Sequence, residues 1–154
     1  MSRNAYLWGL WVCTGAVLVA SAYQALSGHW ISFFLFWPGF ESLQKYAAFL
    51  DTLSSLHRVL GLVTGLLSIP VLVFAFLSRS KVFVRIFALV GCAMVIVAAL
   101  GGYRYVTSAF RDRWSLGQMA DAFVGVFGAY FIQLVFMTIG SRFPWSSRTR
   151  AMQR

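Results

Sequence analysis

Apolar residues along the chain form four long runs that are separated by more polar segments. The runs, at about residues 5–26, 56–77, 84–103 and 116–140, are each long enough to cross the hydrocarbon core of a bilayer, which takes about 20 helical residues. Within each run the apolar positions are continuous, whereas a barrel strand would alternate apolar and polar positions. Pro70 lies inside the second run and is expected to kink that helix. The pattern predicts an all-α, integral membrane four-helix bundle.

The composition supports this class and excludes others. Of 154 residues, 60% are apolar and 11% are charged, and the mean hydropathy is +0.75. Soluble domains carry about 45–50% apolar and about 25% charged residues. In a water-soluble chain the net charge of +9 would indicate a nucleic-acid partner, but here it indicates orientation in a bilayer. We therefore expect a single transmembrane domain, residues 1–154, with no nucleic-acid partner.

Lys and Arg are unevenly divided between the two sides of the predicted bundle. Cytoplasmic loops of membrane proteins carry an excess of these residues. One side holds eight, namely Arg3, Arg79, Lys81, Arg85, Arg142, Arg148, Arg150 and Arg154, and the other holds four, namely Lys45, Arg104, Arg111 and Arg113. We therefore expect a multi-pass protein of the cell (plasma) membrane with both termini in the cytoplasm, where residues 141–154 form a basic tail.

Residues 27–55, between the first two runs, are predicted to form a long outer loop. Its first half is aromatic, with Trp30, Phe33, Phe34, Phe36, Trp37 and Phe40. Such a segment is costly to hold in water, and aromatic residues favour the headgroup level of a bilayer. We expect residues 30–40 to lie at that level or to cap a site at the outer end of the bundle, and these two interpretations are compatible.

Few ionisable residues lie within the predicted spans. His57 and Arg58 begin the second span, and Asp121 lies early in the fourth. Because burying such residues in lipid is costly, each is a candidate for function. The predicted topology places all three toward the outer leaflet, together with the amides of Gln24 and Gln118.

His57 is followed by Gly61 and Gly65 at i+4 and i+8, so the three share one helix face. Two interpretations remain open. The glycines can allow close helix packing, with His57 hydrogen-bonded to Gln118 or Ser54 of the bundle. Alternatively, His57 ligates haem iron, and the glycine face leaves room for the planar ring.

Arg58 keeps its charge in a membrane and needs a carboxylate partner or a route to the interface. Asp121 or Asp51 would serve as that partner, and so would a haem propionate at the outer surface. The sequence leaves this choice open.

Three segments around these residues are similar to motifs of the haem A synthase family. LHRVLGLVTGLL (56–67) resembles the His-Arg-x-x-Gly-x-x-x-Gly opening of that family's second helix. YQALSGHW (23–30) resembles the Gln-x-x-x-Gly at the end of its first helix, and AALGGYRYVTS (98–108) the Leu-Gly-Gly end of its third. Members have eight helices in two four-helix halves. The resemblance, over most of residues 5–140, implies that this chain corresponds to one half, as in compact archaeal members.

Two departures from the family pattern qualify what the resemblance implies. The family carries Glu three residues before the His of helix two, and that Glu serves the oxidation chemistry; here the position is Ser54. The family also has a His near the outer end of helix four, where this chain has GQMADAF. Met119 could ligate in its place unless it only packs, and His29 is a further possible ligand. No catalytic residue is therefore assigned.

We expect a haem-A-synthase-like protein that binds haem b or serves as a subunit of a respiratory electron-transfer complex in the membrane. The expected cofactor-binding residues are His57, Arg58, Gly61, Gly65 and Met119, with His57 and Met119 as the metal ligands. The alternative is a haem-free accessory subunit of a larger membrane complex, and an active compact haem A synthase comes third. The expected partners are the lipid bilayer and other membrane-protein subunits or further copies of the chain.

Overall fold

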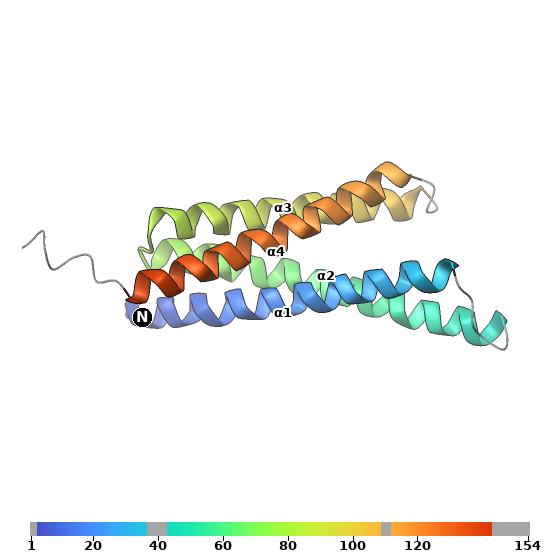
Figure 1. The fold of residues 1–154 in the computed structure, drawn as a ribbon, viewed down its shortest axis with the longest axis horizontal. Coiled ribbons are helices and arrows are strands. Elements are labelled where there is room, and N and C mark those ends of the chain that lie inside the picture. The colour runs from blue at the N-terminus through green and yellow to red at the C-terminus, as the bar shows by residue number, and fades with distance from the viewer. Residues whose placement is uncertain (1–2, 37–42, 109–111, 143–154) are drawn as a thin grey trace, which may run out of the picture.

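The computed structural model describes residues 3–36, 43–108 and 112–142, and four helices occupy almost all of them. They are α1 (Arg3–Phe36), α2 (Leu43–Leu77), α3 (Val82–Thr107) and α4 (Arg113–Arg142). α1 packs mainly against α2 and α3 mainly against α4, while smaller α2–α3 and α1–α4 contacts join the two hairpins (Figure 1). The predicted all-α bundle is confirmed. Most of the predicted basic tail lies outside the described residues.

The helices alternate in direction, which gives the bundle two distinct ends. The start of α1, the α2–α3 turn and the end of α4 lie together at one end, here named the terminal end (Figure 1). The other end, named the loop end, carries the α1–α2 and α3–α4 connections. Four segments are long and apolar enough to cross a membrane, namely Arg3–Ile31, Lys45–Leu77, Val82–Thr107 and Trp114–Ile139. The four predicted spans thus all form such helices.

The first two helices are longer than the sequence predicted, and the outer loop predicted at 27–55 is wrong for most of its length. Residues 27–36 continue α1, and residues 43–55 form the opening turns of α2. The physical reason is local. The segment 43–55 is rich in Leu and Ala, which favour helix, and the first proline after residue 26 is Pro38. Most side chains of residues 30–40 lie outside the described part of the structure. Their expected position at the headgroup level or over the outer end of the bundle therefore stays a prediction.

Each helix turns a narrow stripe of buried residues toward the bundle interior. On α2 the stripe is Thr64, Ser68, Val71 and Ala75, and Ser78 directly after the helix continues it, with alternating steps of four and three residues. Steps that average 3.5 residues keep one face toward the neighbouring helices and favour left-handed bundle packing. The stripe residues are small, which allows membrane helices to approach closely.

Two glycines of α3 allow α4 to pack closely against this helix. Tyr130 is fully buried, and a Cβ built on Gly91 would lie 2.6 Å from its ring atom Cζ. A Cβ on Gly101 would lie 3.1 Å from the backbone of both Ser115 and Met119. The α3–α4 contact therefore depends on glycine at these positions.

The interior also buries polar side chains that the sequence reasoning did not single out. Thr14, Ser21 and Gln133 each bury a polar atom that has no hydrogen-bond partner among the described residues. They come from α1 and α4. Within the described part of the chain, the bundle interior is thus held by close packing more than by side-chain hydrogen bonds.

α4 begins at an aspartate cap. Asp112 Oδ1 accepts hydrogen bonds from the backbone N–H groups of Trp114 at 3.1 Å and Ser115 at 3.2 Å. Its Oδ2 accepts a hydrogen bond from the Ser115 hydroxyl. These bonds satisfy N–H groups that the first helical turn leaves without partners. The Ser115 hydroxyl, followed by the Ser115 backbone N–H, holds the pKa of the Asp112 carboxyl below its usual value.

The cap predicts an acid-sensitive start of α4. Because the pKa of Asp112 is lowered in the folded state, its ionised form stabilises the fold above the ordinary aspartate pKa of about 3.9, and this stabilisation is lost as the pH falls through the lowered folded-state pKa. Asp112→Asn keeps a capping side chain but cannot titrate. Unfolding midpoints measured from pH 7 to pH 3 should fall less for Asp112→Asn than for the wild type. Equal falls would contradict the assignment.

Candidate functional site

His57 lies on the interior side of α2, one heptad before Thr64, and its partly buried ring contacts α1. Its Nδ1 is 2.9 Å from the Ser27 hydroxyl oxygen. A Cβ built on Gly28 would lie 3.1 Å from the ring atom Cε1, so glycine at this position admits the imidazole. The α1–α2 pairing thus fixes both the position and the orientation of the ring.

The hydrogen bonds of Ser27 favour one tautomer of His57. The Ser27 hydroxyl donates its one proton to the backbone carbonyl of Gln24, at 2.9 Å. Toward His57 the same oxygen therefore accepts, and Nδ1 of the imidazole is the donor. The backbone carbonyl of Gln24 is a second hydrogen-bond partner of the imidazole, so two residues of α1 anchor the ring. Histidines that ligate a metal commonly have one ring N–H anchored in this way.

Ser27 is a functional residue that the sequence reasoning missed. The expected partners of His57 were Ser54 and Gln118. Instead, the Ser54 hydroxyl donates to the Asp51 backbone carbonyl at 3.0 Å, and Gln118 lines a groove between α3 and α4. The available signal was the position of Ser27, three residues after Gln24 in the segment YQALSGHW.

The two glycines that follow His57 meet different neighbours. A Cβ built on Gly61 would lie 2.8 Å from Nε2 of Gln24, so the Gln24 amide occupies the surface that was expected to face a planar ring. A Cβ on Gly65 would make only an ordinary contact with Val95 of α3, at 3.8 Å. Gly61 therefore packs toward α1 and Gly65 toward α3.

Met119, the predicted second ligand, packs against α3. A Cβ built on Gly102 would lie 3.3 Å from the Met119 sulfur. His57 contacts α1, so the structure does not bring these two side chains into contact in its present rotamers. His29, the other candidate ligand, is exposed on α1.

His57 and Met119 nevertheless lie at nearly the same level of the bundle. Gly65 of α2 lies near Val95 of α3, and Gly101 of α3 lies against Met119 of α4. Because α2 and α3 are antiparallel, Gly101 is level with residue 59 of α2. Met119 is therefore within two residues, or about 3 Å along the axis, of the level of His57.

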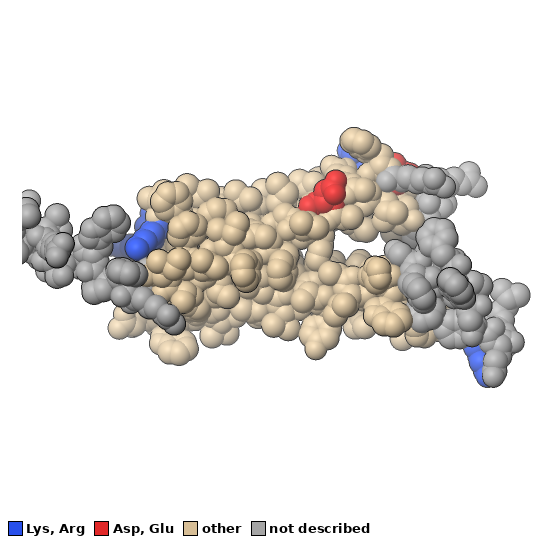
Figure 2. Space-filling view, in the orientation of Figure 1, with Lys and Arg blue, Asp and Glu red and all other residues tan. Residues whose placement is uncertain are grey.

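The two hairpins diverge toward one end of the bundle. α1 and α2 separate from α3 and α4 toward the loop end (Figure 1), and the space-filling view shows an opening between the two halves (Figure 2). His57 and Met119 belong to opposite hairpins.

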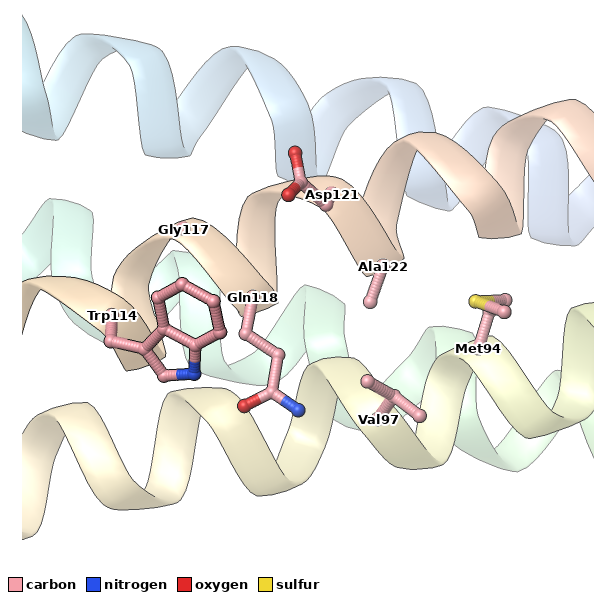
Figure 3. A pocket seen from close by; sticks show the side chains of 7 residues that line it. All are labelled: Met94, Val97, Trp114, Gly117, Gln118, Asp121 and Ala122. Carbon is pink, nitrogen blue, oxygen red and sulfur yellow. The ribbon is translucent and has the colours of Figure 1, made fainter.

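A groove of about 410 Å³ lies between α3 and α4. Its lining residues are Met94, Val97, Trp114, Gly117, Gln118, Asp121 and Ala122. In Figure 3 the Gln118 side chain points toward α3, whereas the Asp121 carboxylate points away from α3. Both residues come from α4, and His57 is not among the lining residues.

Arg58 is exposed on α2, and its Nη2 donates to the Ser54 hydroxyl at 3.4 Å. Asp121 is exposed on α4, and the described backbones of α2 and α4 are not neighbours, because the two helices lie diagonally across the bundle. An ion pair between Arg58 and Asp121 within one chain, which the sequence left open, is therefore not formed.

A cofactor at this site would depend on a single imidazole. Among the described residues, no group of three or more His, Cys, Asp or Glu could hold a metal ion. One histidine does suit haem, because the porphyrin supplies the equatorial ligands and the protein supplies only axial ones.

Comparison of the chain with protein-family models, with curated proteins and with solved structures finds no match. The class defined by the fold is a helical bundle with four helices that can cross a membrane. The resemblance to haem A synthases stays a prediction.

Proposed function

We propose that this protein is a multi-pass protein of the cell membrane that binds b-type haem through His57 and takes part in membrane electron transfer. The observation that carries the proposal is the state of the imidazole. His57 lies on the interior side of α2, and its ring is anchored on α1 by Ser27 at Nδ1 and by the backbone of Gln24.

Each residue of the site has a defined part in this proposal. His57 Nε2 would bind the iron, and Ser27 orients the ring and increases its basicity through the Nδ1–H bond. Gly28 gives the imidazole room beside α1. Met119, from the other hairpin, would be the second residue to hold the haem iron. Haem, when bound, supplies one-electron redox chemistry, and a thioether ligand would raise its potential.

The proposal includes the orientation of the bundle in the membrane. The terminal end would face the cytoplasm, because eight Lys and Arg lie in the segments predicted on that side and four on the other. The haem site would then lie in the outer half of the bilayer. This agrees with the position of His57 in the half of α2 nearer the loop end.

The Ser27 hydrogen bond provides a test with a graded result. Ser27→Ala removes the side-chain partner of Nδ1, and loss of such a partner typically costs 10- to 100-fold in metal affinity. In haem titrations of the apoprotein in lipid nanodiscs, followed by the Soret band, Ser27→Ala should therefore bind at least tenfold more weakly than the wild type. Ser21→Ala, another buried serine of α1, should bind as the wild type does. Equal affinity of Ser27→Ala and the wild type would overturn this role.

A second candidate is a haem-free accessory subunit of a larger membrane complex. The observation that favours it is Asp121, an exposed carboxylate within the candidate span Trp114–Ile139. A charge facing lipid is costly, which favours a protein partner at this face. On this account the protein carries no haem and Ser27 serves packing alone.

A further inference from the structure

Asp121 is an exposed carboxylate of α4 that has no partner in the part of the chain that the structure describes. It lies about two turns inside the candidate span Trp114–Ile139 and is exposed. No hydrogen-bond donor or cation of the described residues reaches it. An ionised carboxylate in contact with lipid is strongly unfavourable, so a cation from outside this chain would stabilise it.

Arg58 on α2 is a cation without a carboxylate partner among the described residues. It is exposed within the candidate span Lys45–Leu77, and its long contact with Ser54 of the same helix does not neutralise its charge. The guanidinium cannot lose its proton in a membrane. A carboxylate at the same depth is therefore its best partner.

The two charged residues lie at nearly the same level but on helices that are diagonal to each other in the bundle. α2 and α4 run in the same direction, and Met119 is level with residue 59 of α2. Asp121 is then level with residue 61, three residues or about 4.5 Å along the axis from Arg58. The length of an arginine side chain covers that difference.

We propose that copies of this chain associate side by side in the membrane through an ion pair between Arg58 of one copy and Asp121 of the next. All copies of a membrane protein with one topology have the same orientation. Only groups at equal depth can therefore meet between two copies, and this pair fulfils that condition. Guanidinium and carboxylate groups can also form two parallel hydrogen bonds.

The shape of α4 beside Asp121 suits the approach of a helix. The groove of about 410 Å³ between α3 and α4 lies next to the carboxylate (Figure 3). A Cβ built on Gly117, in the lining of that groove, would meet no other atom within 4 Å, so this part of the surface is open. The α2 helix of a neighbouring copy, carrying Arg58, would face this surface.

The proposed contact is heterologous, because it joins two different faces of the chain. A twofold dimer would place the same face of each copy together, whereas a head-to-tail contact that closes gives a ring of three or more copies. The proposal does not rest on the haem site. It does assign Arg58 to Asp121 of another copy instead of to a haem propionate.

Charge reversal provides the test. The wild type, Arg58→Asp, Asp121→Arg and the double variant are each reconstituted in lipid vesicles at a fixed protein-to-lipid ratio. Association is measured by energy transfer between donor-labelled and acceptor-labelled copies, and the size of the assembly by native mass measurement. Arg104→Asp, which reverses an exposed charge of α3, is the matched control. Haem absorbance and helix content are recorded on the same samples.

We expect the wild type, the control and the double variant to form the same assembly of three or more copies. Each single reversal should lose the transfer signal while keeping its helix content. A mixture of the two single variants should recover the signal, because Asp121 then meets Arg58, and Arg at position 121 meets Asp at position 58. This recovery cannot arise from a folding defect in either variant.

Three results would overturn the proposal. The first is a wild type that is monomeric at all protein-to-lipid ratios, which would indicate a different partner for Asp121. The second is an assembly that survives either single reversal, or fails to recover on mixing. The third is a loss of haem absorbance in Arg58→Asp with no change in assembly, which would assign the guanidinium to a haem propionate.

Discussion

Replacing His57 with Ala is expected to abolish the Soret band of the haem-loaded protein. His57 lies on the interior side of α2, and its ring is anchored on α1 by Ser27 and the backbone of Gln24. His29→Ala is the matched control, because it removes the only other histidine, which is exposed on α1. Its spectrum should equal that of the wild type. Absorption spectra of both variants, purified with the same haem supply, provide the measurement.

The account in which His57 only packs makes the opposite prediction. In that case His57→Ala removes one hydrogen bond between helices, and the bundle loses roughly 1 kcal/mol of stability without any change in absorbance. Loss of the Soret band in His29→Ala but not in His57→Ala would also contradict the assignment. Helix content measured by circular dichroism separates loss of haem from loss of fold.

Gly91→Leu is expected to give a large loss of stability. A Cβ at this position would lie 2.6 Å from the ring of Tyr130, which is fully buried and cannot move away. Forcing extra atoms into a packed interior costs about 1–3 kcal/mol, and we expect the upper part of that range because leucine adds four carbon atoms. The midpoint of unfolding in a denaturing detergent titration provides the measurement.

Gly128→Leu on α4 is the control for this substitution. A Cβ built on Gly128 would meet no other atom within 4 Å, so the change in stability should stay within about 0.5 kcal/mol. If both leucine variants lost the same stability, the cost would lie in helix propensity or lipid contact, and the Gly91–Tyr130 packing would not explain it.

The helices could be predicted from the sequence because their signals are local. Continuous apolar runs at 84–103 and 116–140 end at polar turns, and the observed helices α3 and α4 extend these runs by only a few residues at each end. The prediction failed at 27–55, where polar residues in an aromatic segment were interpreted as a loop. The backbone signals there favour helix, since Pro38 is the first proline that would end it.

The site could be predicted only in part, because its contacts depend on the register between helices. His57 was identifiable as an ionisable residue within an apolar run. Its partner Ser27 lies thirty residues earlier on another helix, and no local pattern specifies which α1 residue meets which α2 residue. The same limit applies to Gly61, where Gln24 of α1 fills the space that the glycine leaves.

The central claim is tested most directly by the absorption spectrum of the wild-type protein. The protein would be purified from cells with an adequate supply of haem, and spectra recorded in the air-oxidised form and after reduction with dithionite. We predict a Soret band that shifts on reduction, a reduced α band typical of haem b, and one haem per chain. A colourless protein with intact helix content would contradict haem binding at His57.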